Sequence, residues 1–355
     1  MWKMAAGGGR DALVPLPRGS VPAGEWEQAD PPPGWDLERL TAPLFVPDGP
    51  YGETWAVAVA HRGRLVFERY GGRLPSFHGE GEEVTASTGL LSWSVAKSVL
   101  HAALGVLVAE GRLDLDGSAP VAEWSDRGDP RRAITWRHLL TMRDGLDFVE
   151  DYDPDGGRSD VIQMLFGGVE DMGGFAADRP LVAAPGSRYS YSSGTSNIIS
   201  RLVAGLVGPG PRYEAWLAER LFGPLGMRSA VPGMDGAGTW VASSYLRATA
   251  RDWLRFGELY LRDGRCAGGR LLPPGWVDFG RAPISHDSGD LHFGAHWWTE
   301  NDEFGTFWAD GYEGQTVTVC PALETVFVRF GRTPEGSPAI PEWRREMVSS
   351  MADRS

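Results

Sequence analysis

The sequence predicts an α+β protein in which one antiparallel sheet is built from both ends of the chain and a mostly helical segment is inserted between them. Apolar residues alternate over 54–60 and again over 65–70, which is the period of strands with one buried face. The same alternation returns over 316–320 and 325–330. Between these strand pairs, residues 117–235 show short helical patterns and polar loops with no clear strand. The most economical arrangement joins both strand pairs in one sheet flanked by helices.

The N-terminal elements can be assigned in order. Residues 1–35 include three consecutive prolines and are expected to be an irregular lead-in. A short helix is expected over 36–44. The polar segment 61–64 is a turn that joins the first two strands in a β-hairpin. A loop rich in Gly and Glu then leads to the serine at position 94.

Four helix signals follow along the chain. The long apolar run 95–110 predicts one buried helix that ends at Gly111. Thr135 is a plausible cap for a short helix, and Thr249 with Asp252 resembles a capping box that opens an amphipathic helix. Apolar residues at helical spacing over 340–351 predict a closing helix.

These assignments divide the chain into three parts. The lead-in covers residues 1–35. Residues 36–115 and 236–355 are expected to form a discontinuous sheet domain, and residues 116–235 a helical domain.

The chemistry of the chain is expected to centre on Ser94 and Lys97. On a helix they are three residues apart, so they share one face about a turn apart. The hydroxyl would lie near the positive end of the helix dipole. A lysine packed beside it in an apolar setting has a lowered pKa and can accept a proton. The pair is therefore a candidate activated serine nucleophile.

Taken alone, this Ser-x-x-Lys spacing has a simpler interpretation, a helix-capping serine followed by a solvated lysine. The composition favours the catalytic interpretation. The chain has only two lysines, Lys3 and Lys97, among 34 Lys and Arg residues. Arginine evidently serves wherever a permanent cation is enough, so Lys97 marks a place that needs an amine able to lose its proton.

Two further segments are candidates for the site. The polar segment 185–197 runs into an apolar helix over 198–207, and Tyr191 within it could relay a proton. On local sequence alone, a tyrosine that packs the loop is the simpler interpretation. In the segment 309–315, glycines just before a strand permit close approach of the backbone to a ligand, and its N–H groups could complete an oxyanion hole with that of Ser94.

Composition narrows the classes of partner and compartment. A net charge of −13 and the lack of a basic run argue against nucleic acid and anionic membranes as partners. Two cysteines, Cys266 and Cys320, do not make a disulfide framework and suit a reducing compartment. No apolar run approaches about 18 residues, and residues 1–30 lack the apolar core of a signal peptide. A cytoplasmic protein is expected, or a periplasmic or secreted one if an export signal is missing from this sequence.

Neither a metal nor a cofactor is expected. The segment 151–162 opens like a calcium loop, but its twelfth position is Ile162 rather than Glu. His292 and His296 have the spacing of a metal pair on a helix, yet the glycine and aromatic residues around them indicate a strand or a pocket wall. The acidic run 147–155 is expected to be a solvated or helix-capping loop that borders the pocket mouth at most.

The three catalytic segments together resemble the serine β-lactamase and penicillin-binding-protein superfamily, for which Ser-x-x-Lys is a known pattern. The Tyr191-Ser192-Ser193 motif is similar to the Tyr-x-Asn of class C β-lactamases and their esterase relatives. The segment 141–148 with Glu150-Asp151-Tyr152 looks closer still to the 6-aminohexanoate-dimer hydrolase-like branch. The resemblance covers about residues 40–335 and implies a β-lactamase-like fold.

The resemblance also implies roles for individual residues. Ser94 would be the acyl-accepting nucleophile, Lys97 would take its proton, and Tyr191 would relay a proton to the leaving group. The backbone N–H groups of Ser94 and Tyr312 would bind the oxyanion. The candidate substrate-binding residues are Ser193, Asp310, Gly311 and Trp298.

Two departures from the family pattern shape the expected function. Ser193 stands where the family usually has Asn, and Ala309 stands where the family has Lys or His, so no cation would hold the carboxylate of a β-lactam or D-peptide. We therefore expect a serine hydrolase of small esters or linear amides. A β-lactamase or D-stereospecific peptidase, and a catalytically silent penicillin-binding-like protein, are the alternatives. The partner would be a small-molecule substrate, and the sequence does not indicate an oligomeric state.

Overall fold

A computed structural model describes residues 13–76, 80–152, 156–286, 292–300 and 302–353. Its helices are α1 (Leu37–Thr41), α2 (Val95–Ala109), α3 (Trp136–Leu140), α4 (Asp160–Phe166), α5 (Met172–Ala177), α6 (Ser193–Val207), α7 (Pro211–Leu217), α8 (Gly223–Leu225), α9 (Ala250–Leu261), α10 (Trp276–Arg281) and α11 (Ala339–Ala352). Shorter helical turns are η1 (Ala42–Phe45), η2 (Ala122–Trp124), η3 (Pro130–Ala133), η4 (Ala218–Phe222) and η5 (Tyr312–Gly314).

The main sheet contains strands from both ends of the chain, as the sequence predicts. Its order is β2-β1-β13-β12-β11-β10-β9-β8, and β1 lies antiparallel to β13 with Val57 opposite Arg329. The strands of this sheet are β1 (Glu53–His61), β2 (Arg64–Tyr70), β8 (Ser285–His286), β9 (His292–Phe293), β10 (Trp298–Thr299), β11 (Phe307–Gly311), β12 (Gln315–Cys320) and β13 (Thr325–Arg332). Smaller pairings involve β3 (Leu90–Leu91), β4 (Val231–Pro232), β5 (Leu246–Ala248), β6 (Arg265–Cys266) and β7 (Gly269–Arg270).

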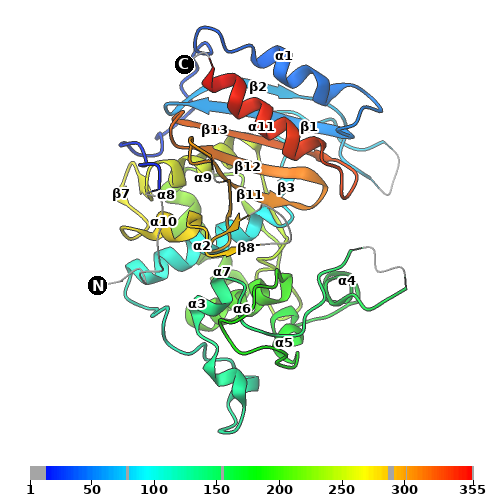
Figure 1. Ribbon diagram of the computed structural model, residues 1–355, viewed down its shortest axis with the longest axis vertical. Coiled ribbons are helices and arrows are strands. Elements are labelled where there is room, and N and C mark those ends of the chain that lie inside the picture. The colour runs from blue at the N-terminus through cyan, green and yellow to red at the C-terminus, as the bar shows by residue number, and fades with distance from the viewer. Residues whose placement is uncertain (1–12, 77–79, 153–155, 287–291, 301, 354–355) are drawn as a thin grey trace.

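Helices cover both faces of this sheet (Figure 1). On one face, α1 and α11 pack over residues such as Val57 and Phe327, and Trp343 of α11 meets the Phe327 ring edge-on at 5.6 Å. On the other face, α9 packs on β12 and β13, and α2 lies beneath β11. Alternate residues along each strand therefore enter two separate cores.

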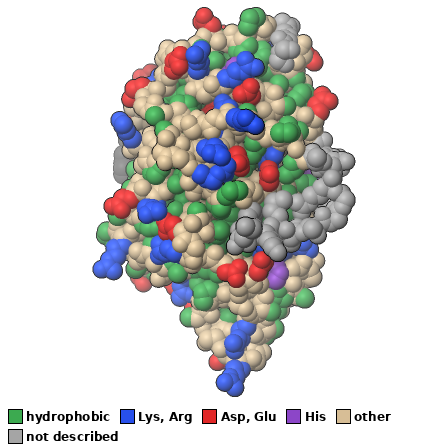
Figure 2. Space-filling view, turned by 90° about the vertical axis from the view of Figure 1, so that its left-hand side faces the viewer, with side chains coloured by type: hydrophobic (Ala, Val, Ile, Leu, Met, Phe, Trp, Pro, Cys, Tyr) green, Lys and Arg blue, Asp and Glu red, His purple; other side chains and the backbone are tan. Residues whose placement is uncertain are grey.

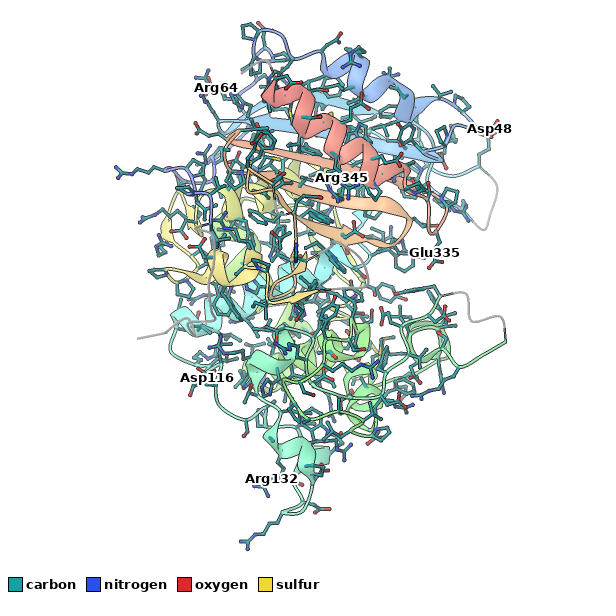
Figure 3. All side chains as sticks on the ribbon, viewed as in Figure 1. Asp48, Arg64, Asp116, Arg132, Glu335 and Arg345 are labelled. Atoms are coloured by element: carbon teal, nitrogen blue, oxygen red, sulfur yellow. The ribbon has the colours of Figure 1, made fainter. Side chains whose placement is uncertain are left out.

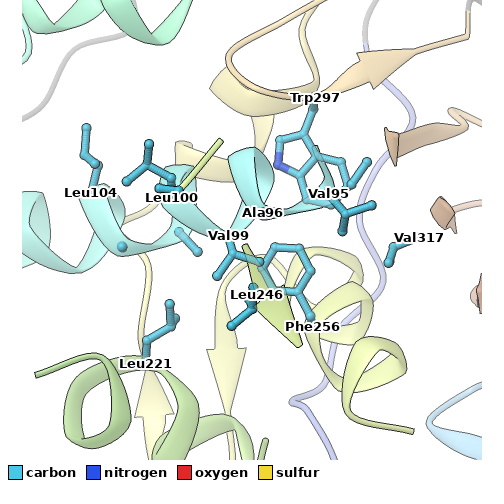
Figure 4. Packing of buried hydrophobic residues seen from close by; sticks show 14 of the residues in the cluster. Val95, Ala96, Val99, Leu100, Leu104, Leu221, Leu246, Phe256, Trp297 and Val317 are labelled. Carbon is cyan, nitrogen blue, oxygen red and sulfur yellow. The ribbon is translucent and has the colours of Figure 1, made fainter. Parts of the chain in front are cut away.

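Helix α2 runs through the larger core, between the sheet and the helices below it (Figure 1). Its residues Val95 to Leu107 are all buried. Figure 4 shows its side chains packed against Leu221, Phe256, Trp297 and Val317 from four other parts of the chain. A helix that is apolar on every side has to be buried in this way. Below it, α6 and the shorter α3 and α5 form a layer of helices, with α4 at its outer side (Figure 1).

Most elements match the sequence prediction. The two hairpins, the helix after Ser94, the closing helix α11 and the caps at Thr135 and Thr249 are confirmed. The Thr249 cap is only half of a capping box, because the Asp252 carboxylate accepts from the backbone N–H and hydroxyl of Ser229 instead. Residues 13–36 are irregular, and residues 1–12 of the expected lead-in lie outside the described residues. The domain boundaries stay a prediction.

Three local expectations were wrong. Helix α6 begins at Ser193 rather than 198, because the Ser192 side chain caps it by accepting from Thr195 N. Strand β11 was not anticipated, and residues 309–311 lie inside it. The short strand β4 lies within residues 117–235, where no clear strand was expected, and pairs with β5.

No helix of the described residues combines the length and the apolar character needed to cross a bilayer. On the face shown in Figure 2, acidic and basic side chains lie interspersed among hydrophobic ones.

Candidate active site

Ser94 stands at the N-terminus of α2, immediately after a strained residue. Trp93 has a φ of 44°, in the left-handed region that non-glycine residues rarely adopt. This turn carries the chain from β3 into the helix and leaves Ser94 partly exposed, while Val95 behind it is fully buried. The Ser94 side chain makes no helix-capping hydrogen bond. The hydroxyl is therefore available to react at the edge of a buried helix.

Lys97 lies one turn further along and is only 2% exposed. Its Nζ donates to Ser94 Oγ at 2.8 Å, to Ser193 Oγ at 2.9 Å and to the Ser243 carbonyl at 2.9 Å. All three acceptors are neutral oxygens. Burial lowers the pKa of Lys97 to about 8, and the charge of Glu150 opposes this shift. The simpler interpretation, in which Lys97 is a solvated lysine, is therefore wrong.

Tyr191 lies beside both groups. Lys97 Nζ is 5.0 Å from the centroid of its ring, and the ring stacks on Trp298 with centroids 5.7 Å apart. Burial and the nearby charge of Glu150 raise the pKa of Tyr191 well above its usual value, although a hydrogen bond with the Ser94 side chain opposes this. The Tyr191 side chain is therefore a neutral phenol, able to donate a proton rather than to act as a standing base.

Glu150 is a site residue that the sequence analysis missed. Its carboxylate accepts from Ser193 Oγ at 2.5 Å and from Ser193 N at 2.7 Å, and Tyr152 OH donates to it at 3.3 Å. The acidic run around Glu150 was expected to be a solvated or helix-capping loop that borders the pocket mouth at most, and Glu150 does accept from the first N–H of α6, but its link to Lys97 through Ser193 was not anticipated. A signal was present: Glu150 belongs to the Glu-Asp-Tyr motif that carried the family resemblance.

Gly311 brings the end of β11 against the start of α2. A Cβ on Gly311 would lie 2.5 Å from the Ser92 carbonyl oxygen, so only glycine permits this approach. The next residue, Tyr312, opens the turn η5. The glycines of this segment were expected to permit close approach to a ligand, which stays a prediction; the structure shows a close approach to the turn before Ser94. The oxyanion role of the Ser94 and Tyr312 N–H groups stays a prediction.

The turn η5 is held from behind by a buried arginine. Arg329 of β13 is fully buried and donates to the carbonyls of Glu313 and Gly314 at 3.0 and 3.1 Å. The same guanidinium reaches the Tyr51 carbonyl at 3.0 Å and the Thr54 hydroxyl. Arg329 thus ties this turn to the first strand of the sheet.

Asp310 differs from the other candidate site residues in its orientation. Within β11 it shares a face with Trp308, over whose ring Arg344 of α11 lies at 3.6 Å. Ala309 and Gly311 share the other face, toward α2. Burial raises the pKa of Asp310 to about 6, and the charge of Arg344 opposes this. The structure therefore groups Asp310 with α11 rather than with Ser94.

Partly buried aromatic rings surround the serine. Tyr152 and Tyr312 stack with centroids 4.8 Å apart, and the Trp93 ring meets Tyr312 edge-on at 5.6 Å. Tyr191 and Trp298 form a second stacked pair. Aromatic rings therefore lie on two sides of the site, and each stacked pair joins the helical segment to the sheet.

The two histidines do not form a metal pair. His296 is buried, with Nδ1 2.7 Å from the Leu140 carbonyl and Nε2 3.1 Å from Ser196 Oγ, so both ring nitrogens are engaged within the protein. Burial lowers its pKa to about 3. Across the described ranges, no three His, Cys, Asp or Glu residues are grouped as metal ligands. Residues 153–155 of the calcium-like segment lie outside those ranges.

The family model for Beta-lactamase matches residues 53–348, which is most of the chain. The chain belongs to the beta-lactamase family. A 6-aminohexanoate-dimer hydrolase from Paenarthrobacter ureafaciens is 26% identical to this family member over 264 residues. The match covers 69% of this chain and 66% of that relative, slightly under two thirds of its length.

Solved structures share the fold of this family member. A Bacillus anthracis protein provisionally named as a 6-aminohexanoate-dimer hydrolase matches with a TM-score of 0.75 and 23% identity, over 94% of this chain and 89% of that one. A family VIII carboxylesterase matches with a TM-score of 0.68 and 14% identity, over 92% of this chain and 99% of that one. The resemblance drawn from the sequence motifs is therefore confirmed for both family and fold.

Proposed function

We propose that this protein hydrolyses ester or linear amide bonds of small substrates through an acyl-enzyme intermediate on Ser94. The observation that carries the proposal is the 2.8 Å contact between a buried amine of lowered pKa, Lys97, and the partly exposed hydroxyl of Ser94. A buried neutral amine in hydrogen-bond contact with a hydroxyl is the arrangement that activates a serine nucleophile. Membership in a family of hydrolases supports the same reaction class.

In the acylation step, neutral Lys97 takes the proton of Ser94 as Oγ bonds to the substrate carbonyl carbon. The carbonyl oxygen becomes an oxyanion, which the backbone N–H groups of Ser94 and Tyr312 bind. Tyr191 gives its phenolic proton to the leaving oxygen or nitrogen as the carbon–leaving group bond breaks, and it regains a proton from the Lys97 ammonium. The products of this step are the free alcohol or amine and the acylated Ser94.

Deacylation reverses the roles with water as the nucleophile. Water attacks the ester carbonyl carbon of acylated Ser94 while neutral Lys97 takes its proton, with the Tyr191 hydroxyl as relay. The resulting Lys97 ammonium returns a proton to Ser94 Oγ as the acyl–oxygen bond breaks. The carboxylic acid leaves and the resting enzyme is restored. No cofactor takes part in either step.

The walls of the site favour small esters and amides with an apolar acyl or leaving group. Aromatic side chains line it, and the anionic Glu150 lies beside Lys97. Ala309 is 1% exposed, at the position where related enzymes carry a cation. Nothing at this position attracts a substrate carboxylate, so β-lactams and D-peptides are poor candidates.

The test is hydrolysis of p-nitrophenyl acetate and butyrate by the wild type, Ser94→Ala, Lys97→Arg and Tyr191→Phe, with intact mass after a rapid quench. We expect all three variants to lose activity. We also expect an acyl adduct on the wild type that is absent from Ser94→Ala. Ser349→Ala, on the exposed side of α11, is the matched control and should behave as the wild type.

Three outcomes would redirect the assignment. Full activity of Ser94→Ala would place the nucleophile elsewhere. A stable adduct without steady-state turnover would indicate a silent penicillin-binding-like protein, and efficient nitrocefin turnover would indicate a β-lactamase.

A further inference from the structure

Ser193 links the catalytic lysine to a carboxylate on a separate segment. Lys97 Nζ donates to Ser193 Oγ at 2.9 Å, and Ser193 Oγ in turn donates to Glu150 Oε1 at 2.5 Å. The second carboxylate oxygen accepts from Ser193 N at 2.7 Å. Glu150 thus engages both the hydroxyl and the backbone of one residue in the first turn of α6.

This arrangement fixes the direction of the Ser193 hydroxyl. A serine hydroxyl has a single hydrogen, and here that hydrogen is committed to the carboxylate. Ser193 Oγ can therefore only accept a hydrogen bond from Lys97. The Ser243 carbonyl can likewise only accept, and it lies 2.9 Å from the same nitrogen.

These contacts determine where the lone pair of neutral Lys97, its reactive form, points. A neutral amine has two hydrogens and one lone pair. With its hydrogens directed to Ser193 and Ser243, the lone pair of neutral Lys97 points to its third neighbour, Ser94 Oγ at 2.8 Å. We propose that Glu150 is the positioning residue of this site: by holding the Ser193 hydroxyl it aims the Lys97 lone pair at Ser94, and by its charge it sets the pH at which Lys97 becomes a base. The proposal rests on the proposed function.

The charge effect is assigned to Glu150 because the other titratable groups around Lys97 are either neutral or face an opposite charge. His296 has a pKa lowered to about 3 by burial, and Tyr191 has a raised pKa, so neither carries a charge near pH 7. Asp310, on β11, faces Arg344 of α11. The negative charge of Glu150 raises the pKa of the Lys97 amine.

The decisive variant is Glu150→Gln, which keeps the size of the side chain and removes its charge. Loss of the charge should lower the pKa of Lys97, so the acid limb of kcat/KM should move to lower pH by about one unit. A purely structural role in holding α6 would lower the rate equally at all pH values and leave that limb in place. The control is Glu123→Gln, since Glu123 pairs with Arg201, about two turns beyond Ser193 along α6, and should leave the limb unchanged.

A second measurement does not depend on activity. The chain has only two lysines, so lysine labelled with ¹³C at its ε carbon gives two signals, and Lys97→Arg identifies the buried one. A pH titration of that signal in the wild type and in Glu150→Gln reads the amine directly. An unchanged titration midpoint in Glu150→Gln would overturn the charge part of the proposal even if the protein proved to have no esterase activity.

The positioning part is tested by a double-mutant cycle of Glu150→Gln and Ser193→Ala. If Glu150 aims the lysine through Ser193, the loss of kcat at the pH optimum in the double variant should be close to that of Ser193→Ala alone, about 10- to 100-fold. Independent, additive losses would overturn this part. If Ser94→Ala stays active, the proposed function fails instead, and the ¹³C titration still decides the charge effect.

Discussion

The rings of Tyr152 and Tyr312 stack with their centroids 4.8 Å apart and their planes 23° from parallel. Tyr152 precedes α4 in the helical layer, whereas Tyr312 follows β11 at the end of the sheet. The pair therefore joins the two layers next to the Ser94 turn, where Trp93 also touches Tyr312. Tyr312 OH donates to Glu335 at 3.3 Å, and Figure 3 shows Glu335 beside the strand ends on the same side of the molecule as α4.

We predict that Tyr152→Ala weakens substrate binding more than it slows the chemistry. Removing the ring opens one wall of the site, and an aromatic contact of this kind contributes about 1 kcal/mol. KM for p-nitrophenyl butyrate should rise about five- to tenfold, with a smaller change in kcat. Steady-state kinetics with the butyrate ester measures both.

Tyr152→Phe is the matched control for that variant. It keeps the stacked ring and loses only the 3.3 Å hydrogen bond to Glu150, so its KM should stay within about twofold of the wild type. If Phe and Ala raise KM equally, the hydroxyl rather than the ring is what the substrate needs.

The pH dependence of the wild type should follow Lys97. Only the neutral amine can accept the Ser94 proton, and burial lowers its pKa from the usual 10.5 to about 8. Activity is therefore absent well below this value and rises as the pH passes through it. kcat/KM measured from pH 6 to 9.5 should show one ionisation near pH 8. A flat profile over this range would contradict Lys97 as the base.

Gly311→Ala should damage the site. The added Cβ would meet the Ser92 carbonyl oxygen at 2.5 Å. This oxygen belongs to the backbone and cannot turn aside as a side chain could, so β11 has to move away from the Ser94 turn. We expect a loss of stability of roughly 1–3 kcal/mol in urea unfolding, and a loss of kcat greater than about tenfold.

Gly205→Ala is the control for that substitution. Gly205 lies in α6, is exposed, and has open space where the Cβ would be. In a helix interior this change should stabilise the protein by up to about 1 kcal/mol and leave activity unaltered. A similar effect of both variants would mean that contact with Ser92 is not what requires glycine at 311.

Arg329→Lys should destabilise the sheet and the turn that carries Tyr312. Arg329 is fully buried and donates to several backbone carbonyls from one rigid fork, which a lysine with a single nitrogen cannot replace. The carbonyls left without partners should cost on the order of 3 kcal/mol in the free energy of unfolding. Arg332→Lys, at a side chain that is 62% exposed, should change it by less than about 0.5 kcal/mol. Comparable losses in both variants would show that burial of Arg329 is not decisive.

Much of the fold could be predicted because its signals are local and periodic. The strand patterns of β1, β2, β12 and β13 and the apolar run of α2 are signals of this kind. The expected single buried face was wrong for β1, because helices cover both faces of the sheet and residues 54–60 are all buried. Strand β11 could not be predicted in the same way. Its residues 307–311 carry Trp, Asp and Gly without a clear alternation, and the strand forms because β10 and β12 pair with its two edges.

The sequence by itself determined the nucleophile candidate and its base. The spacing of Ser94 and Lys97, and the scarcity of lysine elsewhere, are properties of the chain that need no coordinates. Only the tertiary structure decided what surrounds them. Glu150 reaches Ser193 from 43 positions away, and the Ser243 carbonyl reaches Lys97 from 146 positions away. Hydrogen bonds between such distant positions depend on how the helical layer packs on the sheet, and the meeting of two particular residues leaves no periodic mark in the sequence.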